Sequence, residues 1–356
     1  MLFSRQQEFG RSVMTPTAAN TAHEADAGPV PAAAGATTRF SSARVAAFTY
    51  RYMVVFVLVA MVVLFSLLLP ETFPTVANLR TITGTQAVLI VLTLGLTATL
   101  AVGEFDLSFG AVLGFSSTLT AVLSVEHGWS TVPAVLAGVV AGTVVGSING
   151  FFVVRLGISS LITTLGVSTI LTGLTLAVSH QQVISGAPQL LVDLSADQLF
   201  GLPYPVYYGM ALAAIAWYVY EHTPLGRYVY FTGEGREVAR LSGLRVDAIR
   251  WGAFIVTGTV SGLAGVLTFG TLGSADPNIG GTYLLPAFAA AFLGATTIKP
   301  GRMNAWGTVV AVYVLVVGVT GLQLLGGAGW LEQVFNGSAL VLAVTFARIV
   351  QRPNQS

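Results

Sequence analysis

The stretch TVPAVLAGVVAGTVVGSINGFFVV, residues 131–154, contains no charged residue. A helix needs roughly 20 apolar residues to cross the hydrocarbon core of a bilayer, so this stretch predicts a transmembrane helix. Its glycines recur at every fourth position, at Gly138, Gly142, Gly146 and Gly150. Small residues at this spacing let helix backbones approach closely in lipid, which favours a helix-packing face, with a pore-lining face as the rarer alternative.

Similar stretches fill the rest of the chain and predict an all-α, polytopic membrane protein. Hydrophobic residues make up 54% of the chain and charged residues 9%, with a mean hydropathy of +0.78. In soluble globular domains charged residues make up about a quarter of the chain. We expect about ten transmembrane helices, at residues 46–69, 84–102, 107–125, 131–154, 159–178, 206–220, 251–270, 284–298, 304–325 and 331–347. The spans 206–220 and 284–298 are short for a crossing, which indicates extension, tilting or a partly re-entrant path.

The positive charges indicate how the chain is threaded. If the amino terminus is inside, Arg80 is the only one of the 16 Lys and Arg residues that falls outside. Short loops rich in Lys and Arg resist translocation, so the pattern predicts cytoplasmic amino and carboxyl termini. We expect a flexible cytoplasmic tail over residues 1–43, which lack a long apolar run, a transmembrane domain over 44–348 and a cytoplasmic tail over 349–356.

Several kinds of chemistry are excluded by the residues that are missing. The chain has no cysteine, so it has no disulfide, thiolate metal site or cysteine nucleophile. Its four histidines form no i, i+4 zinc-binding pair, and no GxxxxGK[ST] motif is present to bind nucleotide phosphates. We therefore expect no catalytic residues, no metal and no cofactor. The net charge of +1 gives no indication of nucleic-acid binding.

Polar residues expected at membrane depth are the candidates for a translocation path. Neutral donors and acceptors that face water suit an uncharged, hydroxyl-rich solute, because weak hydrogen bonds let the solute leave again. For any single Ser or Thr, a hydrogen bond to its own helix or to a neighbouring helix is the simpler interpretation. The candidates are Gln86, Asp106, Ser108, Asn149, Thr163, Thr164 and Gln323.

The sequence GEFDLSFG, residues 103–110, joins two predicted spans. Gly103 breaks the first helix, and Asp106 or Ser108 can cap the second by accepting from its free backbone N–H groups. Capping alone would account for the carboxylate. Alternatively, a helix break at membrane depth lines a cavity or is buried in protein, which would make this segment a hinge or a solute-contacting element.

The predicted inner segment 221–250 is the most charged part of the chain. Val238, Leu241 and Leu244 recur at roughly helical spacing among arginines, and Gly243 provides a helix stop. We expect a short helix parallel to the membrane. It is either an interfacial turn whose arginines set the topology or a docking element for a cytoplasmic partner.

Five motifs in the same order resemble those of a known family. They are GEFDLSFGAVLG, NGFFVVRLGISSLITTLGVSTILTGL, TPLGRYVYFTGEGREVARLSGLRVDAIR, FLGATTIKPGRMNAWGTVV and GLQLLGGAGWLEQVFNGSALVLAV. Over most of residues 75–347 the chain resembles the membrane permeases of ribose-type ABC importers, a group that also handles galactose, xylose, other monosaccharides and related polyols. At Glu104, Gly235, Ser159, Ser160 and Ala295 the chain departs from the residues that this family often has, so the resemblance does not identify the solute.

The resemblance implies a set of partners and a coupling site. A homodimer, or a pair of similar permeases, would lie in membrane lipid of the bacterial inner membrane. An extracytoplasmic sugar-binding protein would deliver the sugar or polyol, and a cytoplasmic ABC ATPase would supply the work. The family's ATPase-coupling loop corresponds here to Gly233, Arg236, Glu237, Ala239, Arg240, Leu241, Ser242 and Gly243.

Two other functions remain open from the residues alone. Asp106 and Glu104, close to a helix break, are compatible with a secondary carrier driven by an ion gradient. The charged inner segment is compatible with a receptor or assembly scaffold that transports nothing.

Overall fold

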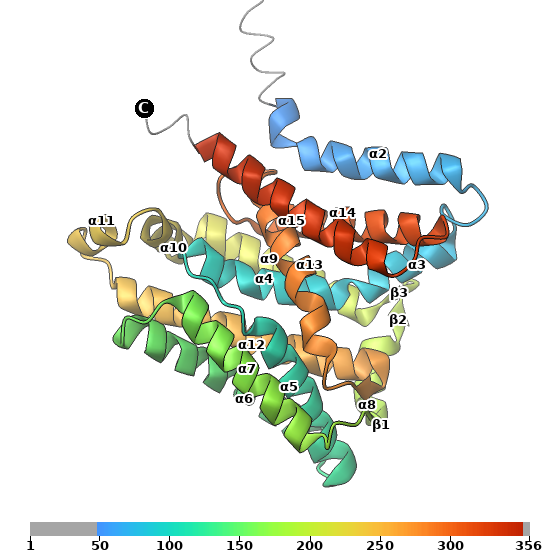
Figure 1. Ribbon diagram of the computed structural model, residues 1–356, viewed down its shortest axis with the longest axis horizontal. Helices are drawn as coiled ribbons and strands as arrows, with labels where there is room; N and C mark the ends of the chain where they lie inside the picture. Colours follow the sequence, from blue (N-terminus) through green and yellow to red (C-terminus); the bar gives the residue numbers. More distant parts are fainter. Residues whose placement is uncertain (1–47, 352–356) are drawn as a thin grey trace, which may run out of the picture. The chain divides into compact units, whose positions relative to one another are not determined.

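The computed structural model describes residues 48–351, so the predicted tail over residues 1–43 and the last five residues lie outside the described part of the chain. The described part is almost entirely helical (Figure 1). Its α-helices are α2 (Met53–Leu68), α3 (Val76–Thr85), α4 (Ala87–Ala101), α5 (Phe109–Ala121), α6 (Thr131–Gly150), α7 (Ser160–Val178), α8 (Gln189–Ala196), α9 (Tyr204–His222), α10 (Pro224–Glu234), α11 (Arg236–Leu241), α12 (Val246–Leu272), α13 (Ile279–Gly294), α14 (Ala305–Leu324) and α15 (Trp330–Gln351).

Short π-helical turns and strands complete these elements. The π-helical turns η1 (Val122–Glu126) and η2 (Phe151–Arg155) extend α5 and α6. Four two-residue strands form two antiparallel pairs, β1 (Ile184–Ser185) with β4 (Ser274–Ala275) and β2 (Gln198–Leu199) with β3 (Leu202–Pro203).

Each of the ten predicted spans coincides with a helix of the structure. Within residues 48–351, six helical segments are long and apolar enough to cross a membrane, which confirms the all-α, polytopic membrane fold: Val76–Ala101, Phe109–Glu126, Thr131–Arg155, Ser160–Val178, Val246–Leu272 and Ala305–Leu324. The two short predicted spans are also helices, but their bounds differ. The span 206–220 is part of α9, which is longer at both ends, and the span 284–298 corresponds to α13, which begins and ends earlier.

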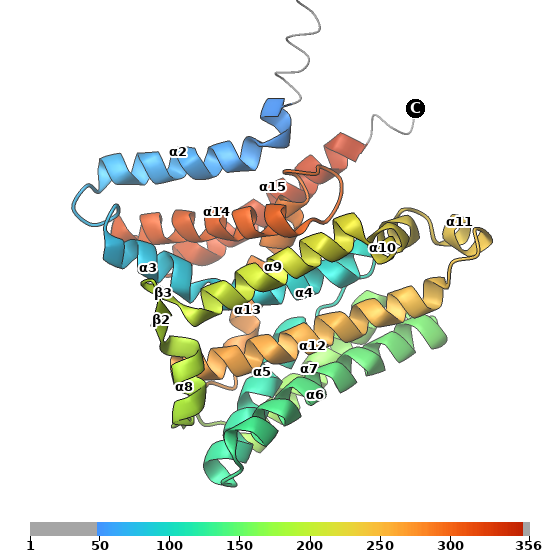
Figure 2. The ribbon, with the colours of Figure 1, turned by 180° about the vertical axis from the view of Figure 1, so that it is seen from behind.

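The helices run between two ends of the bundle. In both views, α10 and α11 lie at one end, called here the α11 end, and α8 lies with the four strands at the other, called the α8 end (Figures 1 and 2). Two of the predicted cytoplasmic cations contact the ends of helices. Arg51 Nε donates to the carbonyl of Ile298, which follows α13. The guanidinium of Arg155 lies 5.9 Å from the ring centre of Trp251 near the start of α12.

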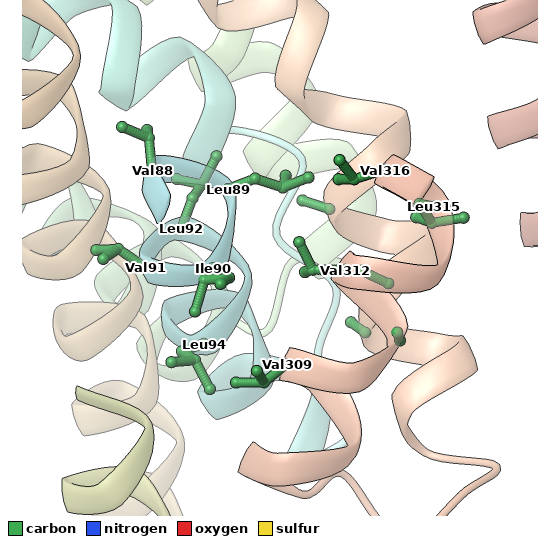
Figure 3. Packing of buried hydrophobic residues seen from close by; sticks show 14 of the residues in the cluster. Val88, Leu89, Ile90, Val91, Leu92, Leu94, Val309, Val312, Leu315 and Val316 are labelled. Atoms are coloured by element: carbon green, nitrogen blue, oxygen red, sulfur yellow. The ribbon is translucent and has the colours of Figure 1, made fainter. Parts of the chain in front are cut away.

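Helix α4 forms the centre of the bundle and is buried on nearly all sides. It packs against α9, α12, α13 and α14. Figure 3 shows Leu89 and Leu94 of α4 directed towards Val309 and Val316 of α14. A helix that is apolar all round can be enclosed by lipid or by other helices, and the burial of nearly every residue of α4 shows that neighbouring helices enclose it.

The glycine face of α6 packs directly on α12, as expected from its spacing. A Cβ on Gly142 would overlap the backbone of Gly258, and a Cβ on Gly146 would overlap that of Phe254. Gly138 faces side chains of α5 instead. The close approach of these backbones therefore requires glycine, and the packing interpretation is confirmed.

Candidate functional site

A cavity of about 410 Å³ lies among α3, α4, α13, α14 and α15. This volume is within the range of small-molecule sites. Two predicted path residues, Gln86 at the start of α4 and Gln323 near the end of α14, line this cavity although they are far apart in the sequence. The polar lining residues are Thr81, Gln86, Thr282, Tyr283, Thr320, Gln323, Glu332 and Asn336.

Asn336 gives this cavity an unused hydrogen-bonding group. Its side chain is 5% exposed, and its Oδ1 atom accepts no hydrogen bond from the described residues. A buried polar atom without a partner costs free energy, so a ligand hydroxyl that donates to Oδ1 would remove that cost. One helical turn away, Glu332 adds a carboxylate to the same lining.

A proline in α13 exposes a further acceptor beside the cavity. Pro286 lies inside α13 and has no N–H, so the carbonyl of Thr282, four residues earlier, loses its usual helical donor. Both residues line the cavity. The Thr282 hydroxyl donates to Ile279 O at 2.7 Å, which leaves its oxygen able to accept. Amides, hydroxyls, a carbonyl and the Glu332 carboxylate therefore surround a space whose remaining lining is apolar.

Sequence analysis did not single out six of these polar residues. For Glu332 and Asn336 a signal was present, because an i, i+4 pair shares one face of a helix and α15 is otherwise apolar around them. For Thr81, Thr282, Tyr283 and Thr320 no comparable pattern exists, since their position depends on which helices become neighbours.

The other predicted path residues lie at the helix break, and none of them lines this cavity. Helix α4 ends just before Gly103, whose φ of 75° lies outside the range of a right-handed helix. Asp106 Oδ1 accepts from the backbone N–H of Ser108 at 2.8 Å and from its hydroxyl at 2.6 Å. The Ser108 side chain makes no capping bond to α5. Asp106 accepts from the backbone N–H groups of Ser108 and Phe109, where α5 begins. Of the two predicted capping residues, only Asp106 therefore caps the helix.

Hydrogen bonds from two helices hold the segment of the break. Asn149 Nδ2 of α6 donates to Ser108 Oγ at 2.8 Å. In α7, Thr164 Oγ1 accepts from the backbone N–H of Leu107 at 2.9 Å. Thr163, beside it, is buried, and its hydroxyl has no partner among the described residues. Asp106, Ser108, Asn149 and Thr164 therefore act together to fix the start of α5 against α6 and α7.

The predicted coupling residues form a protruding turn at the α11 end. α11 contains Arg236 to Leu241, and the chain then reverses at Gly243, whose φ of 83° favours glycine. Ala239 is buried, whereas the side chain of Leu241 is 81% exposed. The expected short helix is present, with Glu237, Arg240 and Ser242 also on the exposed turn, and its orientation parallel to the membrane stays a prediction.

Glycine and tyrosine attach this turn to the bundle. Gly233 in α10 packs so closely on the carbonyl of Ala101 that a Cβ would overlap it. The Tyr230 hydroxyl donates to Met303 O at 2.6 Å, and the Arg302 guanidinium lies 5.3 Å from the ring centre. Burial raises the pKa of Tyr230 above its usual value, so its hydroxyl stays protonated as a donor.

A carboxylate joins the turn to the helix break. Glu104 Oε1 lies 2.7 Å from Arg236 Nη2 of α11 and 2.6 Å from Arg250 Nη2 of α12. Arg236 Nη2 also donates to the carbonyl of Gly103 at 3.0 Å. The Glu104 side chain is 4% exposed. Glu104 is thus paired with two cations, and Asp106 is engaged with Ser108, so the two carboxylates that suggested an ion-driven carrier both have structural partners.

Comparison with known proteins gives a family and several relatives. Residues 78–344 match a family described as "Branched-chain amino acid transport system / permease component". The D-allose transport system permease protein AlsC of Escherichia coli K12 is 30% identical over 307 residues, 86% of this chain and 94% of that protein. The ribose import permease protein RbsC of Haemophilus influenzae is 29% identical, over 81% of this chain and 90% of that protein.

A third relative is named for a different solute. The autoinducer 2 import system permease protein LsrD of Yersinia pseudotuberculosis is 29% identical, over 71% of this chain and 78% of that protein. No solved structure matches the chain.

Proposed function

The chain belongs to the family of branched-chain amino acid transport system permease components, and from this premise we propose that it carries a monosaccharide or related polyol across the bacterial inner membrane. It is a multi-pass membrane protein and the non-catalytic permease component of an ABC importer. The proposed solute class agrees with relatives named for D-allose and ribose. A relative named for autoinducer 2 shows that similar chains also serve another solute.

The cavity around Asn336 is the observation that carries the proposal. Its lining offers amide, hydroxyl and carbonyl groups in a space large enough for a small molecule. Sugar hydroxyls donate and accept at once, so neutral groups of both kinds suit them. Gln86 and Gln323 are the predicted path residues that we assign to this site.

An ATPase and a solute-binding protein are the partners that a permease of this family requires. We assign the ATPase to the exposed turn of α11 and the binding protein to the α8 end. Both termini and the α11 end then face the cytoplasm, because the predicted threading puts every Lys and Arg except Arg80 on the cytoplasmic side. A second copy of the chain, or a similar permease, completes the translocation unit.

Transport assays in proteoliposomes test the proposed function. The purified chain is reconstituted with its ATPase and its solute-binding protein, which are first sought among the products of adjacent genes, with radiolabelled D-ribose and D-allose as probes. We expect accumulation only when the chain, both partners and ATP are present, and no effect of an uncoupler. An ATPase shifts the permease between states only by binding one state better than the other, so ATP must change the rate of uptake.

Two other results would contradict the proposal. Uptake by the chain alone that collapses with an uncoupler would indicate an ion-driven carrier. A complex that hydrolyses ATP but moves neither probe, nor any of a panel of other sugars and polyols, would indicate a scaffold or a different solute class.

A further inference from the structure

A single carboxylate oxygen connects three separate elements at the α11 end. Glu104 Oε1 lies 2.7 Å from Arg236 of α11, and it accepts from Arg250 of α12 through both Nε, at 2.8 Å, and Nη2, at 2.6 Å. Glu104 itself belongs to the segment between α4 and α5. The α11 turn, the start of α12 and the helix break therefore meet at one atom.

The side chains of Glu104, Arg250 and Arg236 differ in how much of their surface is exposed. The side chains of Glu104 and Arg250 are 4% and 11% exposed, whereas that of Arg236 is 44% exposed. Charges in a buried pair interact more strongly than exposed ones, because protein screens them less than water. Arg250 thus neutralises Glu104 within the bundle. Arg236 is the more exposed of the two arginines, and its ion pair with Glu104 attaches α11 to the buried pair.

The segment that follows Glu104 leads directly into the bundle. The next backbone N–H, of Phe105, donates to Ser160 Oγ at 3.2 Å, and Leu107 N–H donates to Thr164 Oγ1 at 2.9 Å. Asp106 then holds Ser108, which accepts from Asn149 of α6. A displacement of Glu104 is therefore passed within four residues to the first turn of α5 and to helices α6 and α7.

The structure also provides room for α11 to move. A polar cavity of about 470 Å³ separates Arg236 and Arg240 from Ser159 and Ser160 at the start of α7, with Glu104 in its wall. Its remaining acidic group, Asp247, lies 3.2 Å from Arg240. These two side chains are 58% and 55% exposed, so solvent screens this contact and it constrains α11 less than Glu104 does.

We propose that Glu104 is a positioning residue that transmits movement of α11, through Arg236, to the helix break that fixes the start of α5. This proposal rests on the proposed function, since it assumes that an ATPase moves α11. It assigns a role to a side chain outside the exposed docking turn and outside the solute cavity. The link is mechanical: no proton or bond is transferred, and only the ion pair must persist while α11 moves.

Arg236→Gln is the variant that separates transmission from folding. It removes the ion pair between α11 and Glu104 but leaves Glu104 paired with Arg250, so no buried charge is left without a partner. We expect normal abundance, normal co-purification with the ATPase and ATP hydrolysis within about twofold of the wild-type complex. Uptake of radiolabelled D-ribose or D-allose per ATP hydrolysed is expected to fall at least tenfold.

A matched control and a conservative variant accompany this measurement. Glu221→Gln removes a largely buried carboxylate at the same end, where Glu221 pairs with Lys299 and, among the described residues, makes no ion pair with the helix break. It is expected to retain the wild-type uptake per ATP. Arg236→Lys keeps the positive charge and is expected to restore part of the coupling, because attraction to Glu104 remains although the planar guanidinium is lost.

A double-mutant cycle tests whether the two residues act as one link. If they do, Glu104→Gln combined with Arg236→Gln lowers uptake per ATP no further than the stronger single variant. The proposal is overturned if Arg236→Gln matches Glu221→Gln in uptake per ATP, if the effects of the two substitutions multiply independently, or if Arg236→Gln loses the ATPase from the complex. Absence of ATP-dependent uptake in the wild-type complex would instead reject the proposed function.

Discussion

The backbones of Gly142 in α6 and Gly258 in α12 are in direct contact, and a Cβ on either residue would overlap the carbonyl oxygen of the other. Such contacts hold helices together in lipid, where the hydrophobic effect contributes little to helix association because the surrounding lipid is also apolar. α6 and α12 also share the contact between Gly146 and Phe254, so the glycine face is continuous along the pair.

Gly258→Val is therefore expected to destabilise the protein. The added side chain would force the two backbones apart, at a cost of about 1–3 kcal/mol. Gly252→Ala on the same helix is the control, because a Cβ there meets no atom within 4 Å. Alanine favours helix by up to about 1 kcal/mol relative to glycine, so this control should equal or exceed wild type. Thermal unfolding in detergent measures both, and equal losses would reject the specific contact.

Asn336→Leu is expected to impair transport without loss of fold. Leucine removes the unpaired Oδ1 and fills polar space, so uptake of D-ribose or D-allose should fall at least tenfold in the reconstituted complex, which is about 1.4 kcal/mol of lost stabilisation. Thr345→Val on the same helix is the control, because Thr345 is exposed and its hydroxyl bonds only to Val341 O among the described residues. Unchanged uptake in Asn336→Leu would remove this cavity from the path.

Leu241→Ser is expected to weaken attachment of the ATPase. The exposed leucine is the apolar tip of the α11 turn, and burying such a side chain in a partner contributes about 1.5–3 kcal/mol. Co-purification of the ATPase should decrease by at least tenfold, whereas membrane abundance stays constant. Leu199→Ser, an exposed leucine at the α8 end, should leave attachment unchanged. Equal attachment in both variants would place the docking surface elsewhere.

The orientation in the membrane can be tested with single cysteines, because the natural chain has none. Ser242→Cys marks the α11 end and Phe200→Cys, at a side chain that is 93% exposed, marks the α8 end. A membrane-impermeant maleimide applied to spheroplasts should label Phe200→Cys readily and Ser242→Cys only after the membrane is permeabilised. The reverse pattern would contradict the predicted cytoplasmic termini.

Local sequence patterns were sufficient to predict α11 and the helices of the ten spans, but not α3, α8 or α10. They also predicted one packing face. Uncharged apolar stretches gave the spans, because the thickness of a bilayer sets helix length. The four-residue glycine spacing gave the packing face of α6, and Gly243 gave the end of α11. These features depend on neighbours within one or two helical turns, so no knowledge of the tertiary arrangement was needed.

The site depends on contacts between distant residues, which a single sequence does not reveal. Glu104 attracted attention only as an acidic residue near a helix break, since its partners Arg236 and Arg250 follow 132 and 146 residues later. Gln86 and Gln323 were recognised as polar residues in apolar spans. Asp106, Ser108 and Asn149 also appear in the sequence as polar residues near apolar spans, yet they hydrogen-bond to one another. Only the tertiary arrangement distinguishes polar groups that face a cavity from those that bind each other.

Helix α12 reaches from one face of the molecule to the other without a break. Its 27 residues correspond to roughly 40 Å at about 1.5 Å per residue. Arg250 lies near its first turn, and at its far end the carbonyl of Gly273 accepts from the backbone N–H groups of Gly186 and Ala187, next to β1. A continuous helix resists compression along its axis. Under the proposed function, a displacement of α12 at the end that we assign to the ATPase would therefore also displace its end at β1, which we assign to the binding protein.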